Sequence, residues 1–374
     1  MFAAVLSLSA MASDPSGARP GAGAPELTSV PLAELRVGAE IEPASTATFG
    51  VAARGGLEVE RKVLKARLSL QASKVWGLDA EPAMGSIGAE IGEAWLSWSP
   101  PISSALGITT TAGVQRVEFD DGLLIGADDR RGNARFPLAG RATLRASPWV
   151  LDGLVGLASG PAPVAAGPEV LPRTPFAAGR LAVGRDNPVW RWEVAATALR
   201  LYDDGESGSF TGGVVATAGL NRVRLDTGAL LQDGSSHPGL LARGRAGFAM
   251  GDESRVVLWA GVLARGTEEN PGFTRPLGTT DTYAGWLGLL EREGVLRDAF
   301  LDLDATLAPS LRFTTEAHHF WVDGVALGPE LDVDLTWYWS PLAALRLRGS
   351  ALTPWSSAQP VELAGALTFE ASVH

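Results

Sequence analysis

The chain has 374 residues, no cysteine and a formal net charge of −11, and its mean hydropathy is +0.11 although 20% of its residues are charged. The lack of cysteine excludes disulfides and thiolate metal sites, and the negative charge argues against a nucleic-acid partner, because phosphate binding needs a basic surface. No segment reaches the roughly 18 uninterrupted apolar residues that a membrane helix needs.

The N-terminal region predicts a targeting segment. An apolar run over residues 2–11 ends in a small-x-small pattern at residues 10–12, which is typical of a signal-peptide cleavage site. We therefore expect a signal peptide over residues 1–12, with a frayed terminus as the alternative because a basic n-region is missing. Residues 13–30, rich in Pro, Gly, Ala and Ser, predict a flexible lead-in to a single domain over residues 31–374.

The segment 330–339 shows the pattern that dominates the rest of the chain. Acidic or hydroxyl-bearing side chains occupy its even positions, and Leu, Val and Trp occupy its odd positions. Successive side chains of a strand point to opposite faces, so one face is polar and the other apolar. Alternation of this kind predicts eighteen strands, near residues 33–42, 47–58, 63–76, 90–99, 105–117, 134–146, 149–159, 177–186, 189–202, 209–220, 222–232, 239–250, 254–265, 297–307, 310–321, 330–340, 342–352 and 361–373.

The connections between these strands alternate in length. Tight turns near 99–101, 147–148, 187–188, 251–252, 309–310 and 340–341 fall on one side, and long loops at 77–89, 118–133, 160–176 and 266–296 fall on the other. Ten Trp residues lie at or near strand ends, where indoles suit the lipid headgroup region; a Trp-rich soluble sandwich is the alternative. We predict an all-β transmembrane antiparallel β-barrel of about 18 strands in the bacterial outer membrane, with both termini periplasmic.

Scattered motifs resemble those of the alginate-export outer-membrane porins. They are the strand end 113–115, the loop residues 120–126 with Asp129, Arg131, Arg135 and Phe136, and, in the C-terminal third, 283–285, 294–298, 318–320 and 328–332. The resemblance implies an eighteen-stranded barrel that exports an anionic polysaccharide, with periplasmic export machinery as a partner.

The polar faces of the predicted strands carry the charges expected of such a pore. Basic residues are assigned to the lumen at Lys65, Arg67, Arg135, Arg141, Arg145, Arg180, Arg191, Arg222, Arg224, Arg243, Arg245, Arg312, Arg346 and Arg348. Interleaved acids are assigned to Glu193, Asp226, Asp298, Asp302, Asp304, Glu316, Glu330, Asp332 and Asp334. Guanidinium forks match carboxylates, so we expect conduction of a polyanion. The alternatives are charges that only pair across the lumen and a general or substrate-specific diffusion porin for small anionic solutes.

Two long loops could enter the pore. The loop 118–133, with Asp120, Asp121, Asp129, Arg130 and Arg131, predicts a gate, with an ordinary surface loop as the alternative. The apolar run 286–290 predicts that the loop 266–296 packs into the lumen or along the rim, with a short extra strand as the alternative.

Catalysis has little support in this sequence. Four His residues occur, at 237, 318, 319 and 374, and no Gly-x-Ser-x-Gly elbow accompanies them. His318 and Glu316 are two candidate ligands, short of a metal site. We therefore expect no enzymatic activity, no cofactor and no metal, and a monomer surrounded by outer-membrane lipid.

Overall fold

The computed structural model describes residues 27–41, 47–77, 88–103, 105–119, 125, 137–159, 173–187, 190–202, 209–233, 239–251, 255–266, 294–340, 342–355 and 361–373. The predicted signal peptide and the apolar run 286–290 lie outside these residues. So do Arg135 and the predicted gate residues Asp120, Asp121, Asp129, Arg130 and Arg131.

The described residues form eighteen strands that are long enough to cross a membrane. They are β1 (Thr28–Ile41), β2 (Ala47–Arg61), β3 (Leu64–Gly77), β4 (Gly88–Trp98), β5 (Leu106–Val114), β6 (Leu138–Ala146), β7 (Trp149–Ser159), β8 (Arg173–Asp186), β9 (Trp190–Leu201), β10 (Phe210–Leu220), β11 (Val223–Gln232), β12 (Gly239–Met250), β13 (Val256–Arg265), β14 (Leu296–Ala308), β15 (Leu311–Val322), β16 (Val325–Ser340), β17 (Ala343–Leu352) and β18 (Glu362–Val373). Among the described residues, no helix has the length and apolar content of a membrane span.

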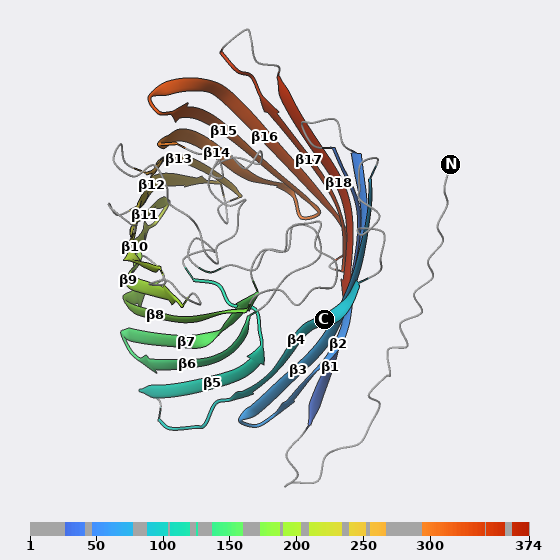
Figure 1. Ribbon diagram of the computed structural model, residues 1–374, viewed down its shortest axis with the longest axis vertical. Coiled ribbons are helices and arrows are strands. Elements are labelled where there is room, and N and C mark those ends of the chain that lie inside the picture. Colours follow the sequence, from blue (N-terminus) through green and yellow to red (C-terminus); the bar gives the residue numbers. More distant parts are fainter. Residues whose placement is uncertain are drawn as a thin grey trace.

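The sheet closes on itself. Each strand pairs antiparallel with its neighbours in sequence, and β18 pairs with β1 from Ala33↔Val373 to Ile41↔Gly365. The ring is visible in Figure 1, where the last strands lie beside the first. Closure leaves no strand edge, so no row of backbone amides faces lipid without a partner. The predicted all-β, eighteen-stranded barrel is confirmed.

The two faces of the wall follow the predicted alternation. On β16, Leu331, Val333, Trp337 and Trp339 are exposed on the outside, whereas Glu330 is buried on the inside. The same arrangement recurs on other strands, for example with Leu64, Leu68 and Leu70 outside and Ser69 and Gln71 buried inside. The outer face is therefore apolar and the inner face mostly polar, as a membrane barrel requires.

The connections divide the barrel into two rims. Short turns such as residues 62–63, 147–148, 221–222 and 309–310 lie on one rim, which we call the turn rim, and most long connections lie on the other, the loop rim. The first residues of β1 and the last residues of β18 also lie at the turn rim, since Thr28 pairs with Glu60 next to the turn at Lys62.

One tight turn on the loop rim differs from the expected pattern. Asp323 and Gly324 join β15 to β16 with φ values of 51° and 77°, the left-handed pair that a two-residue hairpin needs. Consequently β16 begins at Val325 rather than near 330. At the other end of the chain β1 begins at Thr28, inside the segment expected to be a flexible lead-in.

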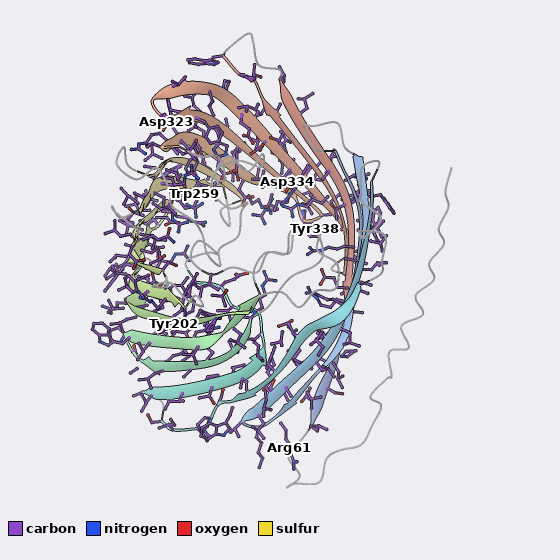
Figure 2. The ribbon with its side chains drawn as sticks, in the orientation of Figure 1. Arg61, Tyr202, Trp259, Asp323, Asp334 and Tyr338 are labelled. Atoms are coloured by element: carbon purple, nitrogen blue, oxygen red, sulfur yellow. The ribbon has the colours of Figure 1, made fainter. Side chains whose placement is uncertain are left out.

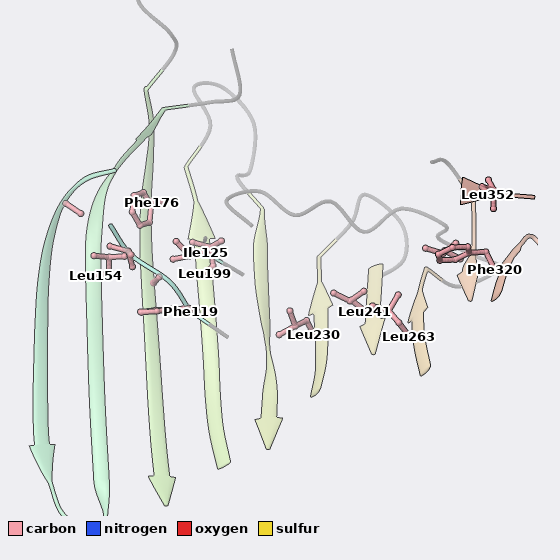
Figure 3. Close-up of a cluster of buried hydrophobic side chains, with 14 residues drawn as sticks. Phe119, Ile125, Leu154, Phe176, Leu199, Leu230, Leu241, Leu263, Phe320 and Leu352 are labelled. Carbon is pink, nitrogen blue, oxygen red and sulfur yellow. The ribbon is translucent and has the colours of Figure 1, made fainter. Parts of the chain in front are cut away.

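Apolar side chains line the lumen near the loop rim. We call this band the apolar collar; it consists of Leu154, Phe176, Leu199, Leu230, Leu241, Leu263, Leu296, Phe320 and Leu352, all at most 2% exposed. Val117, Phe119 and Ile125 from the segment after β5 belong to the same cluster (Figure 3). Phe119 N donates to Ile125 O at 2.8 Å, and Gln115 Nε2 donates to Ala139 O at 2.8 Å. The described part of this connection therefore lies inside the barrel.

Candidate functional site

Ion pairs line much of the lumen wall, and most of them join residues on neighbouring strands. The strand alternation places both partners on the inner face, and the antiparallel register brings them together. In this group an arginine on one strand meets a carboxylate on the next, in the pairs Arg54–Glu34, Arg67–Glu93, Arg141–Asp152, Arg180–Glu193 and Arg245–Asp226. Lys65 pairs with Glu58 in the same way at 2.6 Å.

Asp226 is the most enclosed of these carboxylates. Its Oδ2 accepts hydrogen bonds from Arg245 Nε at 3.1 Å and Nη2 at 2.9 Å, and its Oδ1 lies 3.3 Å from Arg243 Nη2. The side chains of Arg243 and Asp226 are only 4% and 6% exposed. The Arg245 guanidinium also lies 4.6 Å from the ring centroid of Trp259, a cation–π contact (Figure 2 labels Trp259).

Four arginines near the turn rim differ from this pattern. Arg145, Arg191 and Arg224 share the inner faces of β6, β9 and β11, and Arg222 lies in the turn before β11. None of the four takes part in an ion pair within the described part of the chain, and all but the half-buried Arg224 are exposed. We call this set the arginine arc.

Glycine residues on neighbouring strands leave space for the side chains of the arc. Gly219 pairs with Arg191 on one side and Arg224 on the other, and Gly247 pairs with Arg224. A Cβ on Gly219 would lie 3.1 Å from Arg191 Nε, so the guanidinium stem lies over this glycine. The arginines are therefore separated across the strands by positions that carry no side chain.

The inner face of β14, β15 and β16 carries a dense group of carboxylates. We call it the acidic wall; it comprises Asp298, Asp302, Asp304, Glu316, Glu330, Asp332 and Asp334. Asp302 lies directly opposite Glu316, which in turn lies directly opposite Asp332. Like charges in directly opposed positions destabilise a sheet, so this row needs positive charge from elsewhere.

Within the described part of the chain, arginines form ion pairs with this wall towards the turn rim. Arg312 Nε donates to Asp304 Oδ1 at 3.0 Å, and Arg346 Nε and Arg348 Nε both donate to Asp334 Oδ2 at 2.7 Å. Figure 2 shows Asp334 on the inner side of β16. Nearer the loop rim the ring of His318 lies between the carboxylates of Asp298 and Glu316.

The predicted site residues therefore fall into three groups. Most of the predicted lumen arginines form ion pairs with carboxylates, and the arginines of the arc do not. Seven of the nine predicted acids lie on β14 to β16, whereas Glu193 lies on β9 and Asp226 on β11. The sequence analysis missed Glu34, Arg54, Glu58, Glu93 and Asp152 as lumen partners, although alternation within their strands could have found them. One of the ten Trp residues expected near a lipid interface is Trp95, and that expectation is wrong: Trp95 lies on the inner face, where its Nε1 donates to Glu93 Oε1 at 3.2 Å.

No family model matches the chain, and no curated protein matches it in sequence. Solved structures from Pseudomonas aeruginosa are similar in fold. OccK3 (OpdO) is 14% identical with a TM-score of 0.62, covering 92% of this chain and 95% of that chain. OpdK with vanillate is 10% identical with a TM-score of 0.63, covering 92% and 98%. OpdQ is 13% identical with a TM-score of 0.61, covering 92% and 98%.

At these identities the likeness shows the fold. One of the similar structures is of the outer membrane protein opdK, and the closed barrel with its apolar outer face locates this chain in a bacterial outer membrane, as predicted. The similar structures are those of OccK and Opd proteins of Pseudomonas aeruginosa.

The resemblance to alginate-export porins is wrong, and so is polysaccharide export as the function. The structures that match are OccK and Opd barrels, and one of them holds the small solute vanillate. Two of the motifs have a local structural cause instead. Gly113 and Gly328 have φ values of +129° and +135°, and a Cβ on either would lie 2.1 Å from a carbonyl oxygen, of Ala94 and Thr353 respectively. Glycine at these positions meets a backbone requirement.

Proposed function

We propose that the chain is a diffusion porin for small anionic solutes, the alternative that the sequence analysis left open. The observation that carries the proposal is the arginine arc. Arg145, Arg191 and Arg224 lie on the inner face without an ion pair in the described residues, so their guanidinium groups are available to a solute carboxylate. Support also comes from the similar structure of OpdK, whose solute vanillate is a carboxylate.

The acidic wall defines where the solute passes. It lies on β14 to β16, across the ring from β6 to β9 (Figure 1). An anion is attracted by the arc and repelled by the wall, so its path follows the arc. A planar guanidinium fork binds a carboxylate through paired hydrogen bonds, and the exposure of the arc to water keeps each contact weak enough for release.

The proposal includes the orientation of the barrel. The turn rim, with the ends of β1 and β18, faces the periplasm, and the loop rim faces outward, which is the usual asymmetry of outer-membrane barrels. The chain acts as a monomer in outer-membrane lipid, without catalysis or a cofactor.

Planar-bilayer recordings of the purified protein test this function. In a KCl gradient we expect a reversal potential of the sign for anion preference, and we expect vanillate to reduce the current in a concentration-dependent manner. The neutral analogue vanillyl alcohol, which lacks the carboxylate, serves as the control and should leave the current unchanged. A cation-selective pore that responds equally to both compounds would contradict the proposal.

A further inference from the structure

The acidic wall contains a group of side chains with the composition of a metal site. Glu316 and His318 lie on the inner face of β15, and Asp332 lies directly opposite Glu316 on β16. One ligand atom from each of the three lies within 4.8 Å of the other two. The sequence alone offered two ligands, Glu316 and His318; the register of β15 against β16 adds the third.

His318 is held in the orientation that a metal ligand needs. Its Nδ1 lies 2.9 Å from Asp298 Oδ2, and the two side chains are 2% and 0% exposed. The imidazole ring stacks on Phe320 with centroids 5.2 Å apart and also contacts Phe300 at 5.6 Å. These contacts leave Nε2 directed at the carboxylate of Glu316, 3.2 Å from its Oε2. A carboxylate that holds the second nitrogen of a ligating histidine is the usual support of such sites.

Buried oxygen atoms around this group are a second observation that favours a cation site. Asp298 Oδ1 and Asp302 Oδ1 are inaccessible to water and accept no hydrogen bond within the described part of the chain. Asp302 lies directly opposite Glu316 and takes part in no ion pair among the described residues. The carboxylates of Asp298 and Glu316 lie on either side of the His318 ring, and Asp302 lies opposite Glu316. Buried carboxylate oxygens are costly unless they are paired.

We propose that Glu316, His318 and Asp332 bind one divalent cation of the Zn²⁺ class in the lumen wall. Imidazole combined with carboxylate oxygens suits Zn²⁺ better than the hard cations Mg²⁺ and Ca²⁺, which take oxygen ligands alone. Three protein ligands leave a coordination position for water or a solute. Asp298 acts as a positioning residue through His318, and Asp302 adds negative charge beside the site. This site goes beyond the proposed diffusion function and depends only on the fold.

Isothermal titration calorimetry with ZnCl₂ on the full-length, detergent-purified protein tests the site without requiring conduction. We expect one Zn²⁺ to bind per chain, with much weaker binding of Ca²⁺. The variants Glu316→Gln and Asp332→Asn should each weaken Zn²⁺ binding at least tenfold. Asp298→Asn should weaken it by about 10–100-fold, the usual effect of losing the residue that orients a ligating histidine.

Asp304→Asn is the matched control, because it removes the same charge from the inner face of β14 but lies outside the group and pairs with Arg312. Its affinity for Zn²⁺ should equal that of the wild type. Heat-dependent migration on SDS gels checks that every variant is folded. Several weakly bound ions with equal affinity in all variants would show diffuse counter-ion accumulation and overturn the proposal. Absence of Zn²⁺ binding to the folded wild type would leave His318 as a hydrogen-bond partner of Asp298 and Glu316, and would overturn the proposal too.

Discussion

The arginine arc and the acidic wall follow the same alternation on the same barrel, but their charges are spaced differently across the strands. In the arc, Arg191 and Arg224 are separated by Gly219, and the neighbour of Arg224 on β12 is Gly247. In the wall, Asp302, Glu316 and Asp332 lie directly opposite one another with no intervening position. The arc therefore keeps like charges apart, whereas the wall concentrates them.

This difference shows what decides the chemistry of a barrel lumen. Alternation along a strand determines that a side chain faces inward, and the register between strands determines what it meets there. Asp226 forms ion pairs with two arginines, which neutralise its charge. Asp302 lies opposite Glu316 and forms no ion pair among the described residues. Like-charged neighbours therefore mark the positions where an ion or solute is needed.

The largest loss in the free energy of unfolding is expected when a substitution removes one partner of a buried charge pair. Asp226→Asn removes the carboxylate shared by Arg243 and Arg245, of which Arg243 is 4% exposed. Loss of one partner from a buried pair costs about 3–5 kcal/mol because the remaining charge stays enclosed. We expect the free energy of unfolding, measured by denaturant titration in lipid vesicles, to fall by that amount.

Asp304→Asn provides the comparison from the acidic wall. Its partner Arg312 is exposed, with a side-chain exposure of 54%, so its loss should cost less than about 1 kcal/mol. Equal destabilisation by the two substitutions would contradict the distinction between enclosed pairs and pairs that face water.

The second prediction separates the two faces of the acidic wall. Val333 is exposed on the outer face of β16, next to the inner-face Asp332. Val333→Arg should cost about 2–4 kcal/mol if the residue lies near the bilayer midplane. Asp332→Asn should be neutral or slightly stabilising, since it removes one of three opposed carboxylates. The same unfolding titration measures both, and a larger effect at Asp332 would refute the assignment of faces.

Much of the fold could be predicted from the sequence, because period-2 alternation survives in nearly every strand. The bounds predicted for β12, residues 239–250, agree with the structure. The predicted start of β16 near residue 330 was too late, because Gly328 and Pro329 interrupt the alternation of apolar and polar residues there. The hairpin signal at Asp323 and Gly324 could have corrected that start. The apolar collar could not be found by alternation, since strand ends such as Leu230 and Leu231 carry Leu on both faces.

The candidate site could be predicted only in part, for a related reason. The alternation of side chains along each strand assigned Glu316, Asp332 and Arg224 to the lumen. The sequence does not determine which residues lie opposite one another on neighbouring strands. The grouping of Asp302, Glu316 and Asp332 follows from two pairings, between residues 14 and 16 positions apart in the sequence. The family resemblance was wrong because some of its motifs contain glycines, such as Gly113 and Gly328, that a positive φ requires. Unrelated barrels share such backbone requirements.

The third prediction concerns ion selectivity, where the two regions should act in opposite directions. The double variant Arg145→Gln/Arg224→Gln should shift the reversal potential towards cations, and Glu316→Gln/Asp332→Asn should shift it towards anions. A lumen charge facing water contributes about 0.5–1 kcal/mol to the energy of a passing ion. Each double variant removes two such charges, so each permeability ratio should change by about five- to thirty-fold. Shifts of the same sign would show that the regions do not act separately.

The smallest effect is the dependence of these shifts on salt. Between 0.1 M and 1 M salt the Debye length falls from about 10 Å to about 3 Å, so charges that face water lose most of their influence. The arc variant changes the exposed Arg145 together with the half-buried Arg224, whereas the wall variant changes Glu316 and Asp332, which are both half-buried. Screening reaches enclosed charges less effectively. We therefore expect the shift of the arc variant to shrink more between these concentrations than the shift of the wall variant, as measured by reversal potentials at a fixed concentration ratio. An equal decline would mean that both regions are equally hydrated, and the contrast between an open arc and an enclosed wall would then fail.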